Sequence, residues 1–82
     1  MTVNYKTHGT CSRNIRLTIE DGIITDVAFQ GGCNGNLQGI CKLVIGQKAD
    51  EVAEKLRGIN CGGKGTSCPD QLAHAIEQAA AL

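Results

Sequence analysis

Apolar and polar residues alternate along the first third of the chain. A two-residue period over residues 14–20 predicts a strand with one apolar face. Its apolar positions are Ile15, Leu17 and Ile19. Residues 3–7 show the same alternation and predict another strand. A turn that contains Cys11 would join it to the strand over residues 14–20.

The dipeptide Asp-Gly at 21–22 predicts a hairpin turn into a further strand over residues 23–29. A two-residue loop would set Leu17 opposite Asp26 and mix the two faces of the sheet. We therefore expect a three-residue loop over 20–22, with a bulge at its glycine. The resulting pairs are Ile19 with Ile23, Leu17 with Thr25, Ile15 with Val27, and Arg16 with Asp26.

After Phe29 the apolar spacing becomes helical and predicts three helices. The first is capped by Asn34 or Asn36, ends at Gly46 and buries Leu37, Ile40, Cys41 and Val44. The second opens at residues 49–51, ends at Gly58 and buries Val52, Ala53 and Leu56. The third begins at residues 68–70 and buries Leu72, Ile76 and Ala79. Strands first and helices second predict an α+β fold, a three-stranded antiparallel sheet covered by three helices.

Size and charge limit the possible functions. The 82 residues form one domain, 1–82, whose core must be aliphatic because Tyr5 and Phe29 are its only aromatic residues. Eight basic and eight acidic side chains cancel, which does not favour nucleic-acid binding. The sequence has no apolar run of membrane-spanning length and no signal peptide, so we expect a reducing cytoplasmic location.

Four of the five cysteines fall in predicted turns, where sulfur contributes little to packing: Cys11, Cys33, Cys61 and Cys68. Two of them, Cys33 and Cys68, precede or open a helix, where free N–H groups and the dipole favour thiolate over thiol. Thiolate is the form that binds metal and attacks electrophiles. We interpret the four as one shared thiolate site. The fifth, Cys41, lies on an apolar stripe and is expected to pack in the core.

Other polar residues are weaker candidates. His8 lies three residues before Cys11 and could bind metal, but a solvated turn histidine is the simpler interpretation. His74 is expected on the surface, Asp70 as a helix cap together with Ser67, and Lys64 near thiolate charge or in solvent. The glycine loops could also cradle an organic cofactor or a nucleotide phosphate, although neither matches a known phosphate-binding fingerprint.

A motif near the C-terminus resembles the one that names the TSCPD domain family: Thr66-Ser67-Cys68-Pro69-Asp70. Two other segments look like the family's further hallmarks: Gly9-Thr10-Cys11-Ser12-Arg13 and Gly31-Gly32-Cys33-Asn34-Gly35-Asn36. The resemblance covers essentially the whole chain and matches small stand-alone members with four characteristic cysteines. It implies metal binding through Cys11, Cys33, Cys61 and Cys68. Related domains end cobalamin-dependent ribonucleotide reductases.

The chain is also distantly similar to iron–sulfur cluster scaffold proteins, which implies the same fold. Cys33 and Cys68 would match two cluster ligands there, whereas Cys11 is extra and Cys61 lies elsewhere than the scaffold's middle cysteine. An iron–sulfur cluster therefore stays open as an alternative cofactor.

Our main hypothesis is one zinc ion held by the four turn cysteines. Four thiolates leave no open position on zinc, so the site would be structural, which does not favour an enzyme. The alternatives are an iron–sulfur scaffold, a thiol-disulfide relay between Cys61 and Cys68, and cofactor binding at the glycine loops. A protein partner stays open, no membrane is expected, and an uncovered sheet edge suggests a homodimer.

Overall fold

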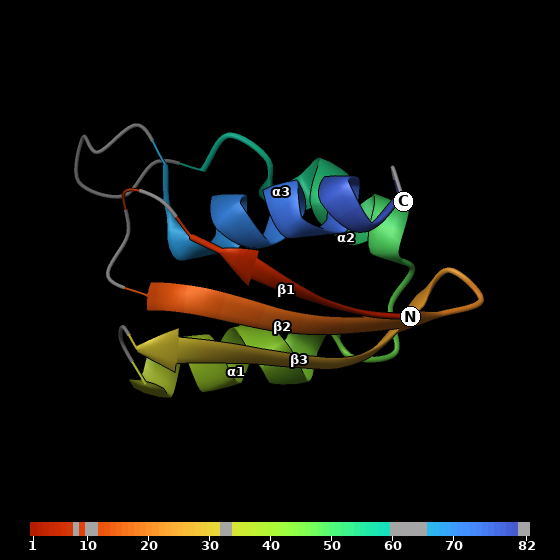
Figure 1. The fold of residues 1–82 in the computed structure, drawn as a ribbon, viewed down its shortest axis with the longest axis horizontal. Coiled ribbons are helices and arrows are strands. Elements are labelled where there is room, and N and C mark those ends of the chain that lie inside the picture. The colour runs from red at the N-terminus through yellow and green to blue at the C-terminus, as the bar shows by residue number, and fades with distance from the viewer. Residues whose placement is uncertain (8, 10–11, 32–33, 60–65, 81–82) are drawn as a thin grey trace.

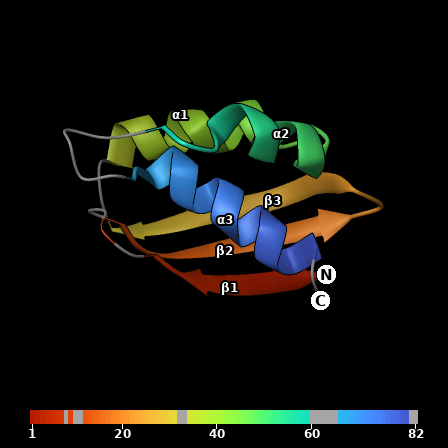
Figure 2. The same cartoon turned by 90° about the horizontal axis from the view of Figure 1, so that it is seen from above.

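The computed structural model describes residues 1–7, 9, 12–31, 34–59 and 66–80. Its elements are β1 (Thr2–Lys6), β2 (Ser12–Glu20), β3 (Ile23–Gly31), α1 (Asn34–Val44), α2 (Ala49–Leu56) and α3 (Cys68–Ala80). The strands form one antiparallel sheet in the order β1-β2-β3. The three helices lie on one side of this sheet (Figures 1 and 2). The predicted α+β architecture is confirmed.

The predicted three-residue hairpin loop is wrong. Glu20 pairs with Ile23, so the turn contains only Asp21 and Gly22. Both turn residues have left-handed backbones, with φ of 52° and 78°. Positive φ at both central positions is the geometry of a type I′ turn, which matches the twist of the two strands.

A bulge in β3 removes the objection to a two-residue loop. The register shifts between Thr18 and Ile19, which makes Thr25 the extra residue on β3. The observed pairs are Ile19 with Ile24, Thr18 with Asp26, Leu17 with Val27, and Ile15 with Phe29. The extra residue returns the apolar side chains of β3 to the core face, and the predicted register is wrong because it placed the bulge at Gly22. Arg16 lies opposite Ala28, although its Nη2 still approaches Asp26 Oδ2 diagonally at 4.0 Å.

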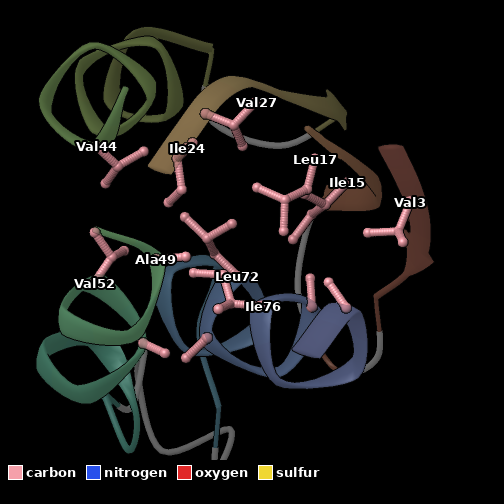
Figure 3. Close-up of a cluster of buried hydrophobic side chains, with 14 residues drawn as sticks. Val3, Ile15, Leu17, Ile24, Val27, Val44, Ala49, Val52, Leu72 and Ile76 are labelled. Atoms are coloured by element: carbon pink, nitrogen blue, oxygen red, sulfur yellow. The ribbon is translucent and has the colours of Figure 1, made fainter. Parts of the chain in front are cut away.

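The core lies between the sheet and the helices and is aliphatic, as predicted (Figure 3). Its largest fully buried side chains are Ile15, Leu17, Ile24 and Leu72. The predicted stripe of α3 is buried throughout, whereas Leu56 of α2 and both Ile40 and Cys41 of α1 pack against the core and stay partly exposed. One helix start differs from the prediction: α1 begins at Asn34, so both Asn34 and Asn36 lie inside the helix and neither stands at its cap position.

The connection between α1 and α2 covers part of the β3 edge. The Gly46 N–H donates to Ile24 O at 2.7 Å, and the Ile24 N–H donates to Gln47 O at 3.0 Å. Gly46 has a φ of 89°, a value that glycine adopts without strain. β1 forms the other edge of the sheet, and the expected homodimer stays a prediction. Within the described ranges, no helix is long and apolar enough to cross a membrane.

Candidate metal centre

The described ends of the cysteine-bearing segments meet at one end of the sheet. β2 begins there, β3 ends there, and α1 and α3 begin there (Figures 1 and 2). Ser12 of β2 pairs with Gly31 of β3. Gly9 lies so close to Thr66 that a Cβ on this glycine would be 3.1 Å from Thr66 Cγ2. Segments distant in sequence thus converge around the start of α3.

Only one of the four predicted ligands, Cys68, lies within the described residues. Cys11, Cys33 and Cys61 lie outside them, as do His8 and Lys64. Among residues that the structure describes, no three His, Cys, Asp or Glu side chains gather around a common point. The ligand set stays a prediction.

Cys68 is the first residue of α3, and its side chain is buried. The preceding residue, Ser67, caps the helix: its Oγ accepts the Asp70 N–H at 3.1 Å. The backbone carbonyl of Ser67 accepts the Gln71 N–H at 2.8 Å, which is the first hydrogen bond of the helix. This cap satisfies an N–H that the helix itself leaves unpaired, and it stabilises the start of the helix at Cys68.

Replacing Ser67 with alanine should lower the free energy of unfolding by about 1 kcal/mol, the usual cost of losing an N-cap. The reason is that Ser67 is 3% exposed, so water cannot readily replace its bond to the Asp70 N–H. Urea unfolding of wild type and variant, both with chelator, measures the loss. An unchanged midpoint would mean that the hydroxyl does not stabilise α3.

The sequence predicts that Asp70 caps α3 together with Ser67, and this is wrong for Asp70. Its carboxylate instead accepts hydrogen bonds from two residues that precede the helix. Its Oδ1 accepts the Gly58 N–H at 2.7 Å, and its Oδ2 accepts the Thr66 hydroxyl at 2.6 Å. The Nε2 of His74 lies 3.3 Å from Oδ2. Cap formation falls to Ser67, because the residue three positions after the cap offers its N–H to the cap side chain.

These contacts were missed because Gly58 and Thr66 carried no chemical signal of their own. The sequence predicts Gly58 only as a helix end, and this is confirmed, because α2 ends at Leu56 and Gly58 has a φ of 87°. The missed signal was the spacing of Thr66 and Asp70, four residues apart across a helix start. A second contact also links the end of α2 to α3, on the protein surface: Arg57 Nε donates to Glu77 Oε1 of α3 at 2.8 Å.

Acid should weaken the fold through Asp70. Hydrogen bonds from Thr66 and then Gly58 hold the pKa of this carboxyl below its ordinary value of 3.8, against the opposing effect of burial. Because the folded-state pKa is depressed, the stabilisation is complete above the unfolded value and is lost as pH falls through the folded one. Urea unfolding of the metal-free protein, measured with chelator between about pH 5 and about pH 2, should show this loss. Asp70→Asn should show less of it, and equal acid sensitivity of the two proteins would assign the effect to other carboxyls.

His74 is exposed, as predicted, and its described contact is with Asp70. Cys41 packs against the core but also lines a surface groove between α1 and β3, with a volume near 540 Å³. Burial raises the pKa of the Cys41 thiol, and the charge on Asp26 raises it further. These conditions favour the neutral thiol, in agreement with a packing role and not with metal binding.

Comparison with known proteins identifies the family. The model of the TSCPD domain matches residues 2–80, which is nearly the full chain. Neither the curated proteins nor the solved structures gave a match. The match includes the motif at the start of α3, whose serine caps that helix and whose threonine and aspartate bind each other. The chain belongs to the TSCPD domain family.

Proposed function

We propose that this domain binds one metal ion, zinc, through Cys11, Cys33, Cys61 and Cys68. The observation that carries the proposal is the meeting of the described segment ends around Cys68. Consecutive Cα atoms are about 3.8 Å apart, so a cysteine cannot lie far from its described neighbours. Cys11 directly precedes Ser12, which pairs with Gly31, and Cys33 directly precedes Asn34. Cys61 follows two residues after Ile59.

The chemistry of this donor set fits a closed zinc site. Four thiolates satisfy the tetrahedral preference of zinc and leave no position for substrate, so the metal would stabilise the fold and not catalyse a reaction. When bound, zinc would cross-link the segments that carry the four cysteines. Cys68 stands at the positive end of α3, and the free N–H groups there favour the thiolate that zinc requires. The proposal includes a reducing cytoplasmic location, because a disulfide would remove two ligands.

The alternatives differ in what they require of Cys68. An iron–sulfur cluster would use the same four thiolates, so it is the second candidate cofactor. A redox relay with Cys61 needs an accessible attacking sulfur, and the burial of Cys68 argues against it. Cofactor binding at the glycine loops would leave the cysteines without a common role.

Elemental analysis of protein purified aerobically without chelator tests the proposal. We expect about one equivalent of zinc per chain, which a strong chelator removes with a large loss of thermal stability. Less than about half an equivalent of any metal, together with no effect of chelator, would refute metal binding. A brown protein with sulfur-to-iron absorption after anaerobic reconstitution would replace zinc with a cluster.

A further inference from the structure

Among the residues that the structure describes, the outer edge of β3 is paired only at its start. The Gly46 N–H donates to Ile24 O at 2.7 Å, and the Ile24 N–H donates to Gln47 O at 3.0 Å. Lys48 forms an isolated antiparallel bridge with Ile23. The connection between α1 and α2 thus begins a fourth strand at this edge, and the pairing stops there because α2 starts at the next residue.

The hydrogen bonds of β2 show which backbone groups of β3 point outward. The Ile19 N–H donates to Met1 O at 2.9 Å, so the backbone of Ile19 faces β1. The bonding direction alternates along an antiparallel strand, and Leu17 therefore also faces β1. Its partner on β3 is Val27, whose N–H and C=O groups consequently point away from β2. The same alternation turns the backbone of Phe29 outward.

A groove with a volume near 540 Å³ runs between this part of β3 and α1, which lies along the β3 side of the sheet (Figure 1). Partly exposed apolar side chains line it, among them Ala28, Phe29 and Cys41. We call it the β3 groove. Within the described ranges, no residue bonds to the outward backbone groups of Val27.

The pKa of the Cys41 thiol places the Phe29 N–H in this groove. Burial raises that pKa, whereas a hydrogen bond from the Phe29 backbone lowers it. A hydrogen bond that lowers the pKa is donated to the sulfur, so the Phe29 N–H points toward α1. Sulfur is a weak acceptor, which leaves this N–H poorly satisfied.

The charge of the β3 groove is positive. Of the described residues that line it, Lys42 alone is charged. Lys42 is exposed in the last turn of α1 and makes no ion pair within the part of the chain that the structure describes. The charge of Asp26 also acts on Cys41, but this carboxylate is opposed by Arg16 Nη2 at 4.0 Å. A carboxylate in the groove would therefore match Lys42.

We propose that the β3 groove binds an extended, acidic peptide segment of a partner protein, which adds a strand to β3 beside α1. The main chain of the segment would bond to the outward groups of Val27 and Phe29, and its alternate apolar side chains would fill the groove. A peptide carbonyl is a better acceptor for the Phe29 N–H than the Cys41 sulfur. A small apolar molecule would leave the backbone groups of Val27 unpaired, which favours a peptide as the occupant. The proposal does not depend on the metal site.

Hydrogen exchange in the free protein checks the open edge first. The Ala28 backbone faces Arg16 of β2, so its N–H is bonded within the sheet and should exchange slowly. The neighbouring Val27 N–H should exchange faster, although its side chain is 5% exposed. Equally slow exchange at both positions would mean that the edge is already occupied, and the proposal would be wrong.

The binding probes are short synthetic peptides in which valine, leucine or phenylalanine alternates with glutamate. Two control versions carry N-methyl groups on alternate amides, one on each set, because only one set faces β3 in an added strand. A third control replaces glutamate with lysine. On the protein, Lys42→Glu reverses the charge of the groove. Lys55→Glu is its matched control, since Lys55 is an exposed base in the last turn of α2.

Titrations followed by the amide resonances of the protein, as purified, measure both place and affinity. An acidic peptide should shift the amides of Val27 and Phe29 and slow exchange at Val27. One N-methylated version should bind at least about tenfold more weakly, and the other should keep its affinity. The lysine peptide and Lys42→Glu should each weaken binding at least about threefold, whereas Lys55→Glu should stay within about twofold.

Four results would overturn the proposal. If both N-methylated versions bind as well as the parent peptide, the groove holds apolar side chains without strand pairing. If Lys55→Glu weakens binding as much as Lys42→Glu, the attraction is not local to the groove. If sedimentation shows a dimer that protects the Val27 N–H without peptide, the groove is an interface between copies of this chain. If no probe shifts Val27 or Phe29 at about 1 mM, the groove binds no such segment.

Discussion

Replacing Cys68 with serine should release the metal and remove much of the domain's stability. If Cys68 is one of four zinc ligands, its loss removes most of a binding free energy that is also folding free energy, on the order of 10 kcal/mol. Folded domains are stable by only about 5–15 kcal/mol, so a loss of this size would be a large fraction of the stability of the metal-bound domain. Elemental analysis and thermal melts by circular dichroism measure both effects, and Cys33→Ser should behave in the same way.

Cys41→Ala is the matched control for this experiment. Cys41 packs against the core and is partly exposed, so its truncation should keep the metal and cost roughly 1 kcal/mol. If Cys41→Ala instead lost the metal while Cys68→Ser retained it, the ligand set would be wrongly assigned.

The fold could be predicted from the sequence because hydrophobic period and turn residues agreed. Over residues 14–20 the two-residue period matches a half-buried strand. The apolar residues of α3 fall on a single face of the helix, which is the face that packs in the core. The hairpin register could not be predicted in this way. Both candidate loops use Asp21 and Gly22, and the choice depends on a bulge at Thr25. A bulge arises from pairing across strands, which no single segment encodes.

Less of the candidate site than of the fold could be predicted from the sequence. The four cysteine ligands are predicted from their placement in expected turns, and this set stays a prediction. The contacts around Cys68 depend on tertiary structure. Gly58 meets Asp70 only after α2 packs on α3, so neither residue signals the contact in sequence. The role of Asp70 in binding Gly58 and Thr66 therefore required the structure.

The other large effect is expected from Leu72→Ala. Leu72 is fully buried in α3 and points into the core between the sheet and the helices (Figure 3). Truncating a buried leucine removes apolar contacts and leaves a cavity, at a cost of about 3 kcal/mol or more. This cost is a large fraction of a domain's stability, which is about 0.05–0.15 kcal/mol per residue. Urea unfolding with chelator measures it without the contribution of metal.

Leu43→Ala makes the Leu72 result specific, because it is the same substitution in another helix. Leu43 of α1 is 76% exposed, so alanine there removes little buried surface and slightly favours the helix. Its free energy of unfolding should stay within about 0.5 kcal/mol of wild type. If the two variants lost stability equally, burial at Leu72 could not be the cause, and the packing of α3 against the sheet would need another arrangement.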